Sequence, residues 1–186
     1  MRNALLAAGA ALALLGGCRE SAEEPAANNA TVQNAPVLPI TDEQVTGALA
    51  PAPASKEDAL KLMHERHEGM EKIGKATKAL SREMKADAPN QATVRSSAAT
   101  IAELAPKVSA WFPKGTGPDV GKTHAKATIW EKPEDFAAKT RDFQAAAQKF
   151  NATATAGDVA AIKAGFADLG KTCKACHDSY RSELKK

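Results

Sequence analysis

Residues 162–180 read IKAGFADLGKTCKACHDSY, and their apolar side chains recur at spacings of three and four. This period places one face of an α-helix against a core. The residues on that face are Ile162, Phe166, Leu169, Cys173, Cys176 and Tyr180. The stretch therefore predicts a long helix whose buried face carries both cysteines.

The first helix of the folded part is expected to begin at Ser55. Serine is a favoured N-cap residue, and Asp58 three positions later makes a variant of the capping box. Pro89 ends this helix, because the residue before a proline avoids helical geometry. The period predicts an inner face, flanked by Ile73 and Leu80, that consists of Leu60, Met63, His67, Met70, Gly74, Thr77, Ser81 and Met84.

Two further helices are expected between these. One extends from about residue 90 to residue 112, and Pro106 should bend it or shift its boundary. The other opens at Pro133 and ends at Gly157, after which Asp158 caps the last helix. The inner residues expected for the two helices are Val94, Ala98, Ile101, Ala105, Val108 and Phe112, then Phe136, Phe143, Ala147 and Phe150.

A Gly/Pro-rich loop separates the second and third predicted helices, at residues 112–132. A loop of this length in a compact domain is either functional or wrapped over part of the fold. Trp130 is expected to pack between this loop and the bundle, without a chemical role.

Four helices joined mostly by short connections predict an all-α fold, an antiparallel up-down four-helix bundle over residues 55–186. No stretch of useful length alternates with a period of two, so no strand is expected.

Two thiols and an imidazole lie together in CKACH, residues 173–177. A thioredoxin-like dithiol requires this pair at a helix N-terminus beside a strand, and a zinc site requires a matching second pair of ligands; the chain offers neither. C-x-x-C-H is the attachment motif of covalent haem c. Cys173 and Cys176 would bind the porphyrin, and His177, one turn after Cys173, would be the axial ligand of the iron.

The second axial ligand is expected on the first helix. In an antiparallel bundle the end of the last helix lies beside the start of the first. Met63, His64, His67 and Met70 all fall within one to four turns after Ser55. The helical period alone does not choose among them.

The chain resembles the cytochrome c prime family, the class II cytochromes c. The resemblance rests on a haem motif that lies on the last helix, and on CKACHDSYR (173–181), ERHEGMEKIGKATKAL (65–80), WFPKGTG (111–117) and IWEKPEDF (129–136) in this order. It covers roughly residues 55–186 and implies one covalent haem c in a four-helix bundle.

The resemblance also implies roles for particular residues. Arg66 would bind a haem propionate, and Met70, four residues later, would face the open side of the iron. Arg181 would lie near the axial imidazole of His177. Typical members of the family have a non-ligating apolar residue at the position of Met70, so this chain resembles the low-spin, methionine-ligated branch. His67 is the main rival ligand.

The expected function is that of a periplasmic carrier of single electrons, with His177 and Met70 as axial ligands and redox proteins as partners. It is not expected to be an enzyme. The alternative is a five-coordinate haem protein that binds NO or CO. A peroxidase activity with His67 as the acid–base residue ranks below both.

Residues 1–17 resemble a lipoprotein signal peptide. A single Arg2 precedes an apolar run that is too short to span a bilayer, and LLGGC at residues 14–18 resembles a lipobox. Cleavage would leave a lipidated Cys18, and Arg19 after it favours the outer membrane over the inner. The alternative is an ordinary signal peptide with an incidental Cys18.

Residues 18–54 are rich in Ala, Pro and Asn and predict a flexible tether between lipid and domain. The net charge of +3 is small, and no aromatic residues are interleaved among basic ones, so nucleic acid binding is not expected. The family resemblance allows a homodimer through the first two helices.

Overall fold

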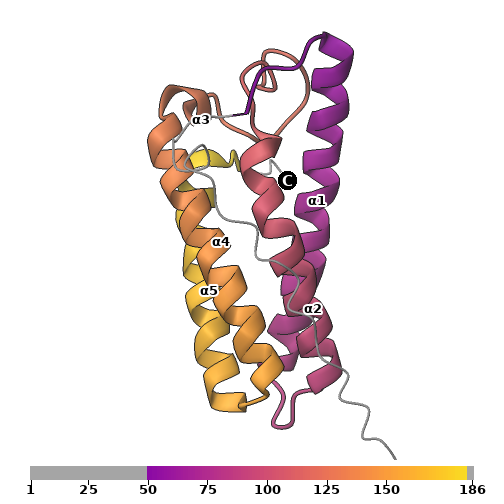
Figure 1. Cartoon of the computed structure of the whole chain (residues 1–186), viewed down its shortest axis with the longest axis vertical. Helices are drawn as coiled ribbons and strands as arrows, with labels where there is room; N and C mark the ends of the chain where they lie inside the picture. Colours follow the sequence, from indigo (N-terminus) through magenta and orange to yellow (C-terminus); the bar gives the residue numbers. More distant parts are fainter. Residues whose placement is uncertain (1–49, 184–186) are drawn as a thin grey trace, which may run out of the picture. The chain divides into compact units, whose positions relative to one another are not determined.

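The computed structural model describes residues 50–183 (Figure 1). Its helices, in chain order, are α1 (Lys56–Glu83), α2 (Gln91–Leu104), the 3-10 helix η2 (Ala105–Trp111), α3 (Thr128–Glu131), α4 (Pro133–Ala156) and α5 (Val159–Tyr180). None of the helices in this range is long and apolar enough to cross a membrane. The predicted signal peptide, Cys18 and most of the predicted tether lie outside the described residues.

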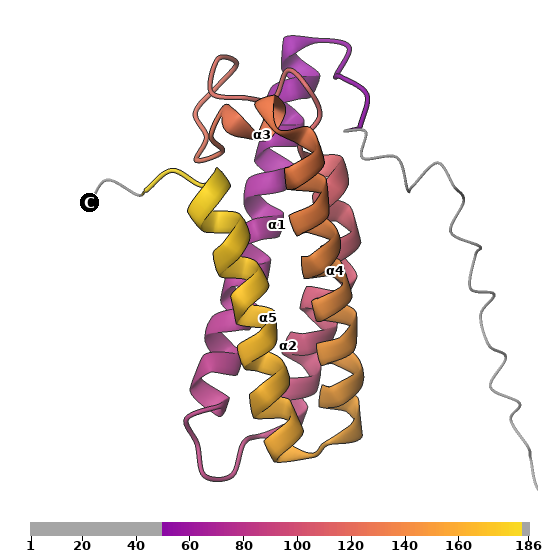
Figure 2. The ribbon, with the colours of Figure 1, turned by 90° about the vertical axis from the view of Figure 1, so that its left-hand side faces the viewer.

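The long helices α1, α2, α4 and α5 form a four-helix bundle, in which α1 packs on α2, α2 on α4 and α4 on α5. Figure 2 shows them along a common long axis, with α4 and α5 in front and α1 and α2 behind. Consecutive long helices run in opposite directions, which confirms the predicted all-α antiparallel bundle. The backbones of α1 and α5, the remaining adjacent pair, approach each other least. We call this side of the bundle the α1–α5 edge.

The start of α1 is the predicted one. The Ser55 hydroxyl accepts a hydrogen bond from the Asp58 N–H at 3.1 Å and donates one to the Asp58 carboxylate at 2.7 Å. The predicted end was too late, because α1 stops at Glu83 rather than at Pro89. The N–H groups of Lys85 and Ala86 donate to the carbonyls of Arg82 and Glu83, three residues earlier, and so form a turn that ends the helix before Pro89.

The buried face of α1 is rotated relative to the predicted face. Ile73 and Leu80, expected at its flanks, are 8% and 0% exposed, whereas Leu60 is 43% exposed. His67 and Gly74 also lie on the surface. The buried residues of the helix are Ala59, Met63, Arg66, Gly69, Ile73, Ala76 and Leu80. The prediction was wrong because contacts with distant residues bury Arg66 and Gly69: Arg66 donates to the Trp111 carbonyl, and the Trp111 ring lies over Gly69.

Pro106 lies where the second helix changes type. The α-helical geometry of α2 ends at Leu104, and the tighter 3-10 helix η2 continues to Trp111 with Pro106 in its first turn. Proline lacks the N–H that a continuing α-helix requires. The predicted shift of boundary is confirmed, and the predicted inner residues of this segment are all buried.

The predicted start and end of α4 and the predicted start of α5 are confirmed. Pro133 opens α4, and Gly157 ends it with a φ of 85°, a left-handed conformation that favours glycine. The Asp158 carboxylate accepts a hydrogen bond from the Ala161 N–H at 2.6 Å and caps α5. The core between the helices is dominated by Phe136, Phe150, Leu80, Ile101, Ile162 and Leu169.

Candidate haem site

Cys173 and Cys176 lie one turn apart on α5 and pack against the core. Both are free, half-buried thiols. Burial raises the pKa of both, that of Cys176 to about 11, so both are protonated at neutral pH. A reactive dithiol requires a lowered thiol pKa. The site therefore does not have the electrostatics of a thioredoxin-like centre.

His177 follows Cys176 on the same helix. The residue as a whole is exposed, yet enough protein surrounds its ring to lower the pKa of the imidazole, and the charge of Arg181 lowers it further. The neutral imidazole is the form that ligates a metal. Arg181 itself is exposed and follows the last turn of α5, where its N–H donates to the His177 carbonyl at 3.0 Å.

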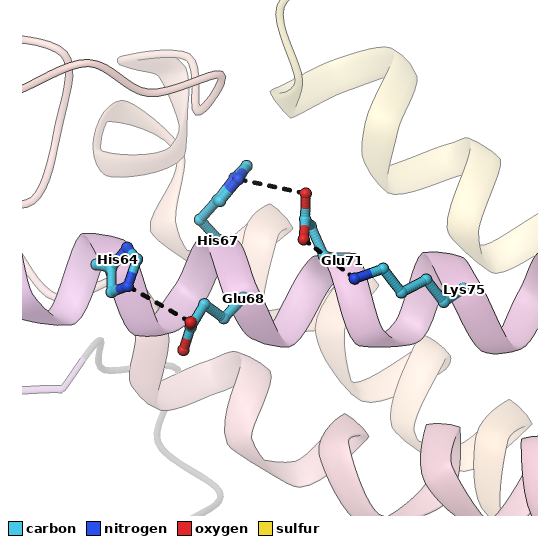
Figure 3. Close-up of polar contacts among 5 residues, drawn as sticks. All are labelled: His64, His67, Glu68, Glu71 and Lys75. Carbon is cyan, nitrogen blue, oxygen red and sulfur yellow. Dashed lines mark hydrogen bonds and ion pairs between the residues drawn. The ribbon is translucent and has the colours of Figure 1, made fainter.

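The candidate ligands on α1 fall into two groups. Met63 is 6% exposed, and Met70 is partly buried against the core. The histidines are exposed and paired with carboxylates one turn later: His64 Nε2 lies 3.5 Å from Glu68, and His67 Nε2 lies 3.6 Å from Glu71 (Figure 3). The two methionines therefore face the protein interior, whereas the two histidines lie on its surface.

Arg66 is a buried cation one turn before Met70, with only 4% of the residue exposed. Its guanidinium donates from Nη1 to the Trp111 carbonyl and to Thr116 Oγ1, both at 3.2 Å. From Nη2 it donates to the Thr116 carbonyl at 3.1 Å and to Thr123 Oγ1 at 2.9 Å. The guanidinium carbon also lies 4.7 Å from the centroid of the Phe112 ring.

The positive charge of Arg66 has only neutral partners within the described part of the chain. None of the ion pairs formed by residues 50–183 includes it. Burial lowers the pKa of Arg66 to about 10. A buried charge without a counter-charge is costly, so a nearby anionic group would be stabilised here.

The predicted Gly/Pro-rich loop contacts Arg66 on α1 and the last turn of α5. Trp130 packs against it as expected, with Nε1 donating to the carbonyls of Phe112 and Pro113 at 3.2 and 2.9 Å. Farther along, Ala125 forms an isolated antiparallel bridge with Arg181, directly after α5. The loop thus contacts both helices that carry the candidate site.

Three loop residues in this region were missed by the sequence analysis: Thr116, Thr123 and Lys126. They bind Arg66 or the end of α5 through hydrogen bonds between residues that are far apart in the sequence. The only sequence signal for them was the length of the loop itself.

The described residues fit a covalently bound haem c. Two cysteines one turn apart face the core, and a histidine follows them directly. The backbones of α1 and α5 approach each other least among the adjacent helix pairs, and α1 carries a buried guanidinium whose partners within residues 50–183 are all neutral. Fold and site together define the class: a four-helix-bundle haem protein of the c type.

The sequence model of the family described as Cytochrome C' matches residues 61–181. The chain belongs to the cytochrome c' family. Members are non-enzymatic haem proteins with covalent haem c, which agrees with the predicted family, cofactor and absence of enzymatic activity.

Curated relatives support the same assignment. A cytochrome c' from Pararhodospirillum photometricum is 37% identical over 116 residues, which cover 62% of this chain and 92% of the relative. A cytochrome c-554 from Cereibacter sphaeroides is 34% identical over 153 residues, which cover 78% of this chain and 98% of the relative.

Solved structures share the fold. The crystal structure of cytochrome c' from Thermochromatium tepidum has a TM-score of 0.63 at 30% identity and covers 71% of this chain and 100% of that one. A cytochrome c' described by its ligand-controlled dimer dissociation has a TM-score of 0.63 at 29% identity, with the same coverage. A nitric oxide complex of a mutant cytochrome c prime from Alcaligenes xylosoxidans has a TM-score of 0.60 at 30% identity and also covers 71% and 100%.

Proposed function

We propose that this protein carries single electrons on a six-coordinate haem c, with His177 and Met70 as the axial ligands and Cys173 and Cys176 as the attachment residues. The haem supplies a one-electron couple, and a thioether ligand favours its reduced form relative to a second imidazole. The observation that carries the proposal is the contrast on α1. Met63 and Met70 pack inward, while the histidines of the same window are exposed and paired with carboxylates; of the two methionines, Met70 is the one that the family resemblance places opposite His177.

The chain's own residues would keep the two ligands in place with little rearrangement. Met70 and His177 both belong to long helices, α1 and α5, that are anchored in the core on either side of the α1–α5 edge. The lowered pKa of His177 keeps its imidazole neutral and available as a ligand.

Arg66 and Arg181 have supporting roles in this proposal. The buried charge of Arg66 would offset that of a haem propionate. Its Nη1 and Nη2 atoms donate to acceptors within residues 50–183, whereas its Nε–H has no acceptor among these residues. Arg181 would remain exposed beyond the last turn of α5, where its charge opposes protonation of His177.

A second candidate function is the binding of NO or CO at a five-coordinate iron. The specific observation in its favour is the structural similarity to the Alcaligenes xylosoxidans protein that was solved as a nitric oxide complex. In this case Met70 would be a core residue and not a ligand.

The absorption spectrum of the reduced holoprotein separates the two functions. We expect sharp, split bands that CO does not change. Met70→Leu keeps the apolar volume but removes the sulfur, and should give a broad, high-spin spectrum that responds to CO. Met63→Leu, a buried methionine on the same helix, is the matched control and should remain low-spin. A wild-type spectrum that is already high-spin and sensitive to CO would contradict the electron-carrier proposal.

We also propose that residues 1–17 direct export, that residues 18–54 form a tether and that a lipidated Cys18 anchors the domain in the periplasm, at the outer membrane. The support is the lipobox-like LLGGC and the attachment of haem c outside the cytoplasm. Mass spectrometry of the mature protein should detect an acylated Cys18, and Cys18→Ser should release the protein from membranes. An unmodified N-terminus elsewhere in the chain would contradict the anchor.

A homodimer through α1 and α2 is the remaining proposal. It is supported by the related cytochrome c' whose dimer dissociates under the control of a ligand. Sedimentation of the holoprotein should give twice the monomer mass, and a monomer at high concentration would rule the dimer out.

A further inference from the structure

The two helices that carry the proposed ligands have few close backbone contacts with each other. Each is packed firmly elsewhere, α1 on α2 and α5 on α4, but their backbones approach each other less than those of any other adjacent pair. Residues that bridge the α1–α5 edge near the site therefore contribute to the distance between the two helices.

One end of a bridge is anchored on α1. Arg66 Nη2 donates to Thr123 Oγ1 at 2.9 Å, the shortest of its four hydrogen bonds, and Arg66 itself is 4% exposed. The same Thr123 oxygen accepts a hydrogen bond from the Ala125 N–H at 3.1 Å, which fixes the direction of the chain after its contact with Arg66. Since Arg66 lies one turn before Met70, this anchor is on the part of α1 that carries the proposed ligand.

The other end is anchored on the last turn of α5. The Lys126 N–H donates to the Tyr180 carbonyl at 2.9 Å, and its ammonium donates to the carbonyls of Asp178 and Ser179 at 3.2 and 3.4 Å. In the opposite direction, the Ser182 N–H donates to the His124 carbonyl at 2.8 Å.

These contacts have a clear physical effect. The last carbonyls of a helix have no partner within it, and a cation near them is favourable. Lys126 therefore supplies donors to the turn that follows His177, and the helix end is less free to fray.

We propose that residues 123–126 are a strap that sets the separation of α1 and α5, and that Thr123 and Lys126 are positioning residues for the ligand pair. The inference rests on the proposed function in one respect: the separation matters because Met70 and His177 must both reach one iron. Neither Thr123 nor Lys126 is assigned a contact with the haem. Binding sites require their ligands to be held to within about 0.5 Å by surrounding residues, and the strap provides such support across the α1–α5 edge.

The test compares side-chain variants in the holoprotein. Thr123→Val keeps the shape but removes the acceptor for Arg66, and Lys126→Met keeps the length but removes the donors to α5. Thr123→Ser and Lys126→Arg should restore these bonds. Lys122→Met is the matched control, because the neighbouring Lys122 makes no side-chain hydrogen bond or ion pair within residues 50–183.

Two readouts are needed. Hydrogen exchange of the peptide at residues 177–183 should become roughly fivefold faster in Thr123→Val and Lys126→Met, as expected for the loss of a hydrogen bond. Exchange at residues 160–170 of α5 should stay unchanged. The low-spin fraction and the response to CO should shift toward those of Met70→Leu, and the conservative variants should recover the wild-type values.

The outcomes separate the strap from the proposed function. Unchanged exchange in both Thr123→Val and Lys126→Met would overturn the strap. Faster exchange with an unaltered spectrum would overturn the positioning role. A high-spin wild type would defeat the Met70 ligation and the positioning role with it, while the exchange data would still decide whether residues 123–126 join α1 to α5.

Discussion

Trp111 lies so closely over Gly69 that a Cβ on the glycine would be 2.2 Å from the indole Cη2. The same tryptophan donates from Nε1 to the Glu65 carboxylate at 3.3 Å, and its carbonyl accepts from Arg66. The missing side chain at position 69 thus lets the end of η2 lie flat on α1, beside the buried guanidinium.

Gly69→Ala should destabilise the protein by about 2 kcal/mol. Alanine favours a helix over glycine by roughly 1 kcal/mol, but overpacking against a buried ring typically costs more. Trp111 is 2% exposed, so protein atoms surround the ring that would have to move. Urea denaturation of the holoprotein measures the effect. In a Trp111→Phe background the cost should shrink, because the outer indole atoms are gone. A stabilising Gly69→Ala would show that the close contact does not exist.

Leu80→Ala and Leu60→Ala test the rotation of the buried face of α1. Leu80 is 0% exposed, so its truncation leaves a cavity and should cost about 3 kcal/mol. Leu60 is 43% exposed, and its truncation should cost less than about 1 kcal/mol. Thermal or chemical unfolding of the two variants gives the comparison directly. Equal losses would favour the predicted face, in which Leu60 is an inner residue and Leu80 a flanking one.

Tyr180→Phe should produce a stability loss that depends on pH. The Tyr180 hydroxyl donates to the Asp135 carboxylate, and this bond is the main cause of the lowered pKa of Asp135. Burial, followed by the interaction with Asp135, raises the pKa of Tyr180.

The sign of the pH dependence follows from these directions. The contribution of Asp135 is complete above the ordinary aspartate pKa, about 3.9, and is lost as pH falls through the lower folded value. The contribution of Tyr180 is complete below the ordinary tyrosine pKa, about 10, and is lost at higher pH. The difference in unfolding free energy between wild type and Tyr180→Phe should therefore be constant near neutrality and narrow below about pH 4. A difference that stays constant in acid would contradict the pairing.

Glu71→Gln should change the unfolding free energy by less than about 0.5 kcal/mol at physiological salt. Glu71 lies between His67 and Lys75 on the surface of α1, at 3.6 and 3.4 Å, and all three side chains are more than half exposed (Figure 3). Water screens such pairs, and ordering the long side chains offsets most of the gain. A loss above about 1 kcal/mol, measured by denaturation, would mean that the chain of charges is structurally important.

The helices were predictable because their signals are local. Ser55 and Asp158 each cap a helix through a bond to a residue three positions later, and Gly157 ends α4 through its own backbone conformation. The adjacency of Cys173, Cys176 and His177 is local as well, so the attachment motif could be found without a structure.

The rest depended on contacts between distant parts of the chain. The partners of Arg66 at Thr116 and Thr123 are 50 and 57 residues away, and no periodicity encodes them. The buried face of α1 includes Gly69, which the Trp111 ring covers from 42 residues away, and the helical period does not mark such a contact. Ligation by Met70 stays a prediction, since Met63 also packs inward on the same helix.

The α1–α5 edge lies between the first and the last helix of the bundle in chain order. Contacts between such remote segments form late, because closing a long stretch of chain costs entropy before the contacts return any free energy. We therefore expect the three other helix interfaces to form before this edge. Substitutions that loosen α2 or α4, far from any cysteine, are therefore expected to slow maturation of the cytochrome itself.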